Sequence, residues 1–330
     1  MAGRDNRIDS IKGLLIILVI LGHIIGSCGS GEVCWDVWKI IYVFHMPLFI
    51  MISGYFTSIK KDINSFWKGL LQIVIPLLAF HVLYVVFSVV VFGNSFSLAY
   101  LCTPYWILWY LLSLIFWKVF IQFTPDWLLT KPYLYLIIAT VVALLCGLMH
   151  YGRILSIQRT LNFYPFFLFG FYMKRGVFKM KLWSKYTSYG FILLTIILVV
   201  NKLPPPIDYN YTSILLRGAD HYTLSELPSK VFFFFLSFVL AISLFNVIPR
   251  IRSLSELGRE TMFYYLYHGL IIRFLLQPIV ANYQLPQSFP FMLLYLMGIV
   301  GLIYFMRRIK FFSWLIHPSI SKIQNYNNDK

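Results

Sequence analysis

Three ionisable residues near the N-terminus, Asp9, Lys12 and His23, have the types and spacing expected of a catalytic site. They lie in the apolar segment IDSIKGLLIILVILGH, residues 8–23. In a helix, the eleven steps from Lys12 to His23 rise about 16 Å and leave the two side chains about 20° apart around the axis. The spacing therefore predicts a cation at one edge of a membrane and a proton acceptor deeper along the same helix face.

The residues beside this pair favour a functional role. Asp9 precedes Lys12 by three residues, which is close enough for an ion pair on one helix face. Gly13 and Gly22 leave room beside both groups for a ligand or another helix. Taken singly, His23 is also compatible with a hydrogen bond between helices and Lys12 with an interfacial position. Ionisable residues within a membrane span are costly, so the shared face favours function.

A second histidine follows in the next apolar segment, IIYVFHMPLFIMISGYF, residues 40–56. If this segment crosses the membrane in the opposite direction, His45 lies roughly 8 Å from the outer edge. This depth is similar to that of His23, so the two imidazoles can face one pocket. Pro47 interrupts the backbone ladder next to His45. Ser53 is expected in a contact between helices, because no G-x-S-x-G nucleophile motif surrounds it.

The elements that position these residues are membrane helices. The chain of 330 residues is 59% hydrophobic and 12% charged, whereas soluble domains carry about 25% charged residues. This composition predicts an all-α polytopic membrane protein with about ten transmembrane helices in a single domain, 1–330, and an external loop at 201–230. The ten expected spans are 11–27, 38–58, 67–92, 104–123, 133–150, 160–174, 186–201, 229–248, 261–281 and 290–306.

The net charge of +16 is explained by membrane topology rather than by a nucleic-acid partner. With the N-terminus inside, 21 of the 28 Lys and Arg residues fall in cytoplasmic segments, so both termini are predicted to be cytoplasmic in a multi-pass protein of the cell membrane. Cys28 and Cys34 share the first external loop, where a disulfide and free thiols are both compatible with the sequence. No spacing typical of metal ligands is present.

The two histidine segments resemble the opening of the integral-membrane acyltransferase-3 family. The family's fingerprint is an Arg or Lys, ten residues and a His, with an Asp three residues before the base; Asp9, Lys12 and His23 match it. The nearest branch resembles fucose 4-O-acetylases and exopolysaccharide acyltransferases. Later segments also resemble the family: YWILWYLLSLIF at 105–116, RTLNFYPFFLFGFYMKR at 159–175 with Pro165 and Gly170, and LGRETMFYYLYHGLI at 257–271 with His268.

The resemblance implies transfer of an acyl group, acetyl or succinyl, from cytoplasmic acyl-CoA to a sugar hydroxyl, with no permanently bound cofactor. Lys12, held by Asp9, is expected to attract the phosphates of CoA. His23 is expected to act as general base or to carry the acyl group covalently. His45 is expected to orient the acceptor or to stabilise the tetrahedral oxyanion.

Further residues are candidates for the acceptor side. Trp106, Trp109 and Tyr110 offer flat faces for a sugar, although core packing is an alternative role for them. Arg159 is expected to bind an acidic or phosphorylated acceptor or to anchor its helix at the interface. His268 is expected to be a structural hydrogen-bonding residue.

A glycan or lipid-linked-sugar transporter is the competing class, because it also needs aromatic residues and buried titratable groups. Such proteins are often built from paired halves with broken helices. The sequence shows no internal repeat, which favours the enzyme.

Overall fold

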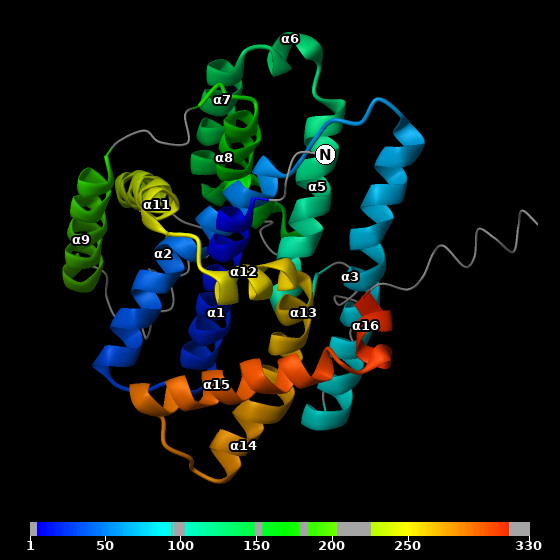
Figure 1. Ribbon diagram of the computed structural model, residues 1–330, viewed down its shortest axis with the longest axis vertical. Helices are drawn as coiled ribbons and strands as arrows, with labels where there is room; N and C mark the ends of the chain where they lie inside the picture. Colours follow the sequence, from blue (N-terminus) through cyan, green and yellow to red (C-terminus); the bar gives the residue numbers. More distant parts are fainter. Residues whose placement is uncertain are drawn as a thin grey trace, which may run out of the picture.

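The computed structural model describes residues 5–93, 95, 103–148, 154–178, 184–202 and 226–316, and all secondary structure in these ranges is helical (Figure 1). Most of the expected external loop, residues 203–225, lies outside the described residues. In chain order the elements are α1 (Asn6–Cys28), α2 (Glu32–Tyr55), α3 (Ile63–Phe92), η1 (Trp106–Leu108), α5 (Trp109–Phe123), α6 (Asp126–Leu129), α7 (Pro132–Leu145), η2 (Cys146–Leu148), η3 (Ile154–Ser156), α8 (Ile157–Lys174), α9 (Lys185–Lys202), α11 (Leu227–Val247), α12 (Arg252–Arg259), α13 (Thr261–Ile271), the π-helical turn η6 (Ile272–Leu276), α14 (Gln277–Asn282), α15 (Phe289–Met306) and α16 (Lys310–Ile316).

The prediction of an all-helical membrane protein is confirmed for these residues, and the described part of each expected span is mostly helical. In the described ranges, six helices are long and apolar enough to cross a membrane: α1, α2, α3, η1 with α5, α11 and α15. Two further apolar helices, Pro132–Leu145 and Lys185–Asn201, are shorter. The count of ten spans and the side on which the termini lie stay predictions.

Helix also occupies segments that the sequence predicts as connections, among them the start of α2 and all of α12. Helix α2 begins at Glu32, six residues before the expected start at 38, directly after Gly31 with its positive φ of 86°. Helix α12, Arg252–Arg259, occupies a segment that was read as a loop. The sequence of α12 is too charged to give a hydropathy signal. The helix is stabilised by its packing against α1, where small residues allow close approach.

Helix α1 lies at the centre of the molecule (Figure 1). It packs against α2, α12, α13 and α15. Apolar residues on several sides of the helix are fully buried, including Leu15, Ile16, Ile20 and Ile24. A helix that is apolar all round is expected to be enclosed by other elements, and this enclosure fixes the positions of both Lys12 and His23.

Two pairs of glycines allow helix backbones to touch. A Cβ on Gly13 would overlap the carbonyl oxygen of Leu254 in α12, and a Cβ on Gly258 would overlap the carbonyl oxygen of Asp9 in α1. The expected close approach at Gly13 is therefore present. In the same way, Gly54 of α2 and Gly170 of α8 each face a backbone carbonyl of the other helix. Small residues at such crossings are how membrane helices gain close packing.

Two side chains at the start of α1 form hydrogen bonds with the C-terminal end of α11 and with the segment that follows it. The Arg7 guanidinium donates to the carbonyls of Phe245, Asn246 and Ile248, at 3.1 Å for Asn246 and 3.2 Å for Ile248. These are terminal carbonyls of α11, where a cation also interacts favourably with the helix dipole. The Ser10 hydroxyl donates to the Ile251 carbonyl at 2.9 Å. The N-terminal end of α1 is thus fixed by hydrogen bonds as well as by packing.

The glycine crossing of α2 and α8 predicts a large effect of a single methyl group. Gly170→Ala should destabilise the protein by about 1–3 kcal/mol, because the added Cβ must displace the backbone of α2. The measurement is the melting temperature in detergent. Gly298→Ala in α15 is the matched control, since nothing lies within 4 Å of its added Cβ. Equal melting temperatures for the two variants would contradict the crossing.

Candidate functional site

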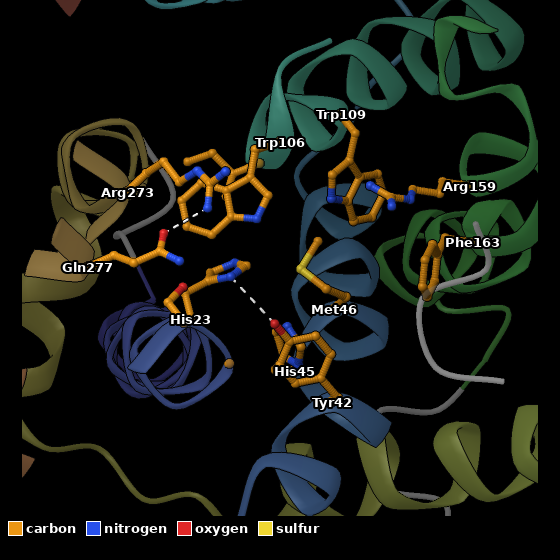
Figure 2. A pocket seen from close by; sticks show the side chains of 13 residues that line it. His23, Tyr42, His45, Met46, Trp106, Trp109, Arg159, Phe163, Arg273 and Gln277 are labelled. Carbon is orange, nitrogen blue, oxygen red and sulfur yellow. Dashed lines mark hydrogen bonds between the residues drawn. The ribbon is translucent and has the colours of Figure 1, made fainter. Parts of the chain in front are cut away.

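A cavity of about 300 Å³ lies beside the C-terminal part of α1 (Figure 2). It is bounded by residues from widely separated parts of the chain. The lining residues are His23, Gly26, Ser27, Tyr42, His45, Met46, Trp106, Ile107, Trp109, Arg159, Phe163, Arg273 and Gln277. This set contains two histidines and two arginines and no carboxylate.

The His23 imidazole is half-buried on the cavity wall and is surrounded by aromatic rings. Its Nδ1 lies 3.4 Å from the hydroxyl of Tyr42. The Trp106 ring meets it edge-on, with ring centres 4.9 Å apart. A Cβ on Gly22 would lie 3.1 Å from the Tyr42 ring, so the glycine beside His23 leaves the space that this tyrosine fills. The position of His23 is suited to contact with a bound ligand.

The structure brings His45 to the same cavity, as the antiparallel arrangement of the two segments predicted. His45 is buried, and its Nδ1 lies 2.7 Å from the carbonyl oxygen of Ile41. Because a carbonyl only accepts, Nδ1 carries the hydrogen and the neutral ring keeps a lone pair on Nε2. The roles of the two histidines in a reaction stay predictions.

Aromatic and cationic groups cover the opposite side of the cavity. Figure 2 shows Trp109, Arg159 and Phe163 facing His23 and Trp106 across Met46. The Arg159 guanidinium lies over the Trp109 ring, 5.3 Å from its centre. Trp106, Trp109 and Arg159 therefore line the cavity together, and their role in binding a sugar stays a prediction.

Tyr110, the third aromatic candidate, is not among the lining residues. It is buried, and its hydroxyl forms a 2.7 Å hydrogen bond with the Ser53 hydroxyl. The Ser53 hydroxyl also donates to the Phe49 carbonyl at 2.9 Å. The bond with Tyr110 connects α2 and α5, whereas the bond to Phe49 lies within α2. Ser53 therefore has the contact between helices that was expected of it, and Tyr110 shares that contact.

Sequence reasoning missed Arg273 and Gln277. The Arg273 guanidinium donates to the Gln277 side chain at 2.7 Å, and both residues line the cavity near His23 (Figure 2). Arg273 lies in the π-helical turn, a local irregularity often found at functional sites. The signal for Arg273 in the sequence is an arginine within an expected apolar span, 261–281.

Backbone strain marks the same region. Trp106, which lies against His23, has a φ of 40° although it is not glycine. A bulky residue in this conformation is uncommon and persists only where the surroundings enforce it, frequently at functional sites.

Asp9 and Lys12 lie at the other end of α1 and are not lining residues of the cavity. The expected ion pair is present, with 3.1 Å between the Lys12 ammonium and the Asp9 carboxylate. Arg259 of α12 lies 3.9 Å from the same carboxylate. Ile16 and Val19, between Lys12 and His23 on the same helix face, are buried. The path between the two groups is closed in this structure.

No cysteine is among the lining residues of the cavity. Cys28, Cys34 and Cys146 are free, so of the two alternatives for the first external loop the structure has unpaired thiols. Within the described ranges, no group of three His, Cys, Asp or Glu residues could hold a metal ion.

Comparison with known proteins gives one family and two relatives. The sequence profile of the family described as "Acyltransferase domain" matches residues 5–308. "Nodulation protein NolL" of Sinorhizobium fredii is 35% identical over 193 residues, covering 52% of this chain and 50% of the relative. The protein of the same name from Mesorhizobium japonicum is 40% identical over 88 residues, covering 23% and 24%. The chain thus matches half or less of the length of these relatives. No solved structure matches the chain.

The extent of the cavity can be tested by thiol labelling of introduced cysteines. Ser27→Cys lies on the cavity wall and should react with a small water-soluble methanethiosulfonate. Ile16→Cys is buried and should stay unlabelled, because the path toward Lys12 is closed. Mass spectrometry measures both against the parent protein, whose own cysteines give the background. Equal labelling of Ile16→Cys would contradict the closed path.

Proposed function

Because the chain belongs to the acyltransferase-3 family and is therefore an acyltransferase, we propose that it moves an acetyl or succinyl group from cytoplasmic acyl-CoA to a sugar hydroxyl of a cell-surface or exported glycan. The observation that carries this proposal is the placement of His23 on the wall of a cavity with flat aromatic faces and cationic donors. Such a cavity offers a base, a surface for a sugar and charge for a developing oxyanion.

The first step of the proposed reaction is proton removal by His23. A sugar hydroxyl takes the place near Nδ1 that the Tyr42 hydroxyl approaches at 3.4 Å. As the oxygen attacks the thioester carbonyl, its proton moves to Nδ1. A general base of this kind contributes about 10²–10⁴-fold to rate. A covalent acyl-histidine route uses the same residue.

The hydrogen bond of His45 supports one of its two expected roles, the orientation of the acceptor. Since Nδ1 donates to the Ile41 carbonyl, the neutral ring offers only an acceptor at Nε2. An acceptor can receive a hydrogen bond from a sugar hydroxyl but cannot stabilise an oxyanion. In this proposal His45 therefore orients the glycan, and the Arg273 guanidinium supplies donors for the oxyanion.

The glycan is proposed to bind between the aromatic and cationic groups of the cavity. Trp106 and Trp109 supply ring faces, and Arg159, above the Trp109 ring, supplies a cation for an acidic or phosphorylated acceptor. Tyr110 has no place in this proposal, since its hydroxyl is bonded to Ser53.

The donor is proposed to bind from the Lys12 end of α1. Support comes from the basic groups there: Lys12 and Arg259 both neighbour Asp9, and Arg307 lies 3.8 Å from Glu260 at the start of α13. CoA carries several phosphates that such an end attracts. It also agrees with cytoplasmic termini. Entry of the donor arm then requires Ile16 and Val19 to separate from their neighbours.

Loss of the proposed base should abolish most transfer. His23→Ala is expected to lower kcat about 10²–10⁴-fold, measured with radiolabelled acyl-CoA and candidate glycans in membranes at equal expression. Tyr186→Phe, at a position 87% exposed, is the control and should match the wild type. Wild-type kcat in His23→Ala would exclude His23 as base.

Substitutions of Lys12 and Arg159 should raise the KM values of different substrates. Lys12→Met is expected to raise KM for acyl-CoA about 10–150-fold, since a charged contact contributes roughly 1.5–3 kcal/mol, while leaving the KM of the glycan unchanged. Arg159→Met should do the reverse. Lys12→Arg, which keeps the charge, is the control. A raised KM for the glycan in Lys12→Met would contradict the assignment of Lys12 to acyl-CoA binding.

A further inference from the structure

His268 of α13 lies beside His23 although it was expected to be only structural. Its side chain is fully buried. The centres of the two imidazole rings are 5.4 Å apart and their planes differ by 33°. His268 is not a lining residue of the cavity, so it lies behind His23 rather than in contact with the space for a substrate.

The hydrogen bonding of His268 leaves one ring atom unused. Nδ1 lies 2.9 Å from the carbonyl oxygen of Tyr264, one helical turn earlier. That nitrogen must donate, so the neutral ring has a lone pair on Nε2. Nε2 is buried and has no hydrogen-bond partner among the residues that the structure describes. Buried acceptors are rarely left unpaired, and an exception calls for a functional explanation.

His23 has the complementary atom. Its Nδ1 faces the Tyr42 hydroxyl, which can donate to it. In that tautomer Nε2 of His23 carries a hydrogen. An N–H···N bond of about 3 Å brings the centres of two imidazole rings to roughly 5 Å, and the observed 5.4 Å is close to that value.

We propose, on the basis of the proposed acyl transfer, that His268 is a positioning residue. The two rings are neighbours but are not hydrogen-bonded in this structure. In the reacting enzyme a small rotation of the His23 ring lets Nε2 of His268 accept a hydrogen bond from Nε2–H of His23. This bond holds His23 in the tautomer that keeps Nδ1 available as base. It also stabilises the imidazolium that forms when Nδ1 takes a proton. His268 itself neither gains nor loses a proton.

The proton balance of the step is complete without His268. The sugar O–H proton moves to Nδ1 of His23, and the oxygen forms a bond to the thioester carbon. The C–S bond breaks when the tetrahedral intermediate collapses, and the leaving CoA sulfur takes the proton from Nδ1. In this proposal the hydrogen on Nε2 of His23 stays in place throughout and is donated to Nε2 of His268.

Close packing keeps the His268 ring from swinging away. A Cβ on the next residue, Gly269, would overlap the hydroxyl of Tyr84. The Tyr265 hydroxyl donates to the carbonyl of Ile107 in η1. The first contact packs α13 against α3, and the second joins α13 to η1, the segment that carries Trp106.

Two conservative variants separate the two nitrogens of His268. His268→Asn keeps an amide near Nδ1 that can donate to the Tyr264 carbonyl, but it has no atom at Nε2. His268→Gln places an amide oxygen near Nε2. We expect His268→Asn to lower kcat about 10–100-fold with both KM values changed less than about twofold, and His268→Gln to recover most of the loss at equal melting temperature.

A double variant tests whether His268 acts through His23. In a His23→Ala background, adding His268→Asn should leave the residual rate unchanged, because the partner of the bond is already missing. A further drop, wild-type kcat in His268→Asn, or equal loss in the Asn and Gln variants with lowered melting temperatures would overturn the proposal. Transfer that needs His23 but tolerates His268→Asn would leave the proposed function standing. Absence of transfer by the wild type would remove both.

Discussion

The contact between the backbones of α1 and α12 at Gly13 and Gly258 is the constraint on which the rest of the structure depends. It seats α1 among α2, α12, α13 and α15. With the axis of α1 fixed, the sequence separation of Lys12 and His23 becomes a separation in space of about 16 Å. The ion pair with Asp9 holds one end, and the ring of Trp106 packs against the other.

Polar groups at the depth of the cavity are satisfied mostly by their own helices. His45 and His268 both direct Nδ1 at the carbonyl four residues earlier, and Arg273 pairs with Gln277 four residues later. This local pairing lets titratable groups lie within apolar helices without charged partners. It also fixes which nitrogen of each imidazole is left to face its surroundings, and so limits the chemistry that each can perform.

The features that could be predicted from the sequence depend on periodicity within single helices. Lys12 with His23, the ion pair with Asp9 and the convergence of His23 with His45 all follow from helical rise and antiparallel direction. Arg273, Gln277 and His268 reach the site through the packing of α13 and α14 against α1 and through a π-helical turn. Neither the packing nor the turn can be predicted from the periodicity of the sequence. Helix α12 was missed because a short charged helix stabilised by tertiary contact carries no hydropathy signal.

The most direct test of the account is a structure of the protein with a non-hydrolysable acyl-CoA analogue, because it locates both ends of the donor at once. The account predicts phosphates beside Lys12 and Arg259. It places the acyl carbonyl within about 3.5 Å of the space that a hydroxyl at Nδ1 of His23 would occupy. It also predicts that Ile16 and Val19 separate from the residues that now pack on them. An analogue whose phosphates lie on the outer side, or whose acyl group lies away from His23, would contradict it.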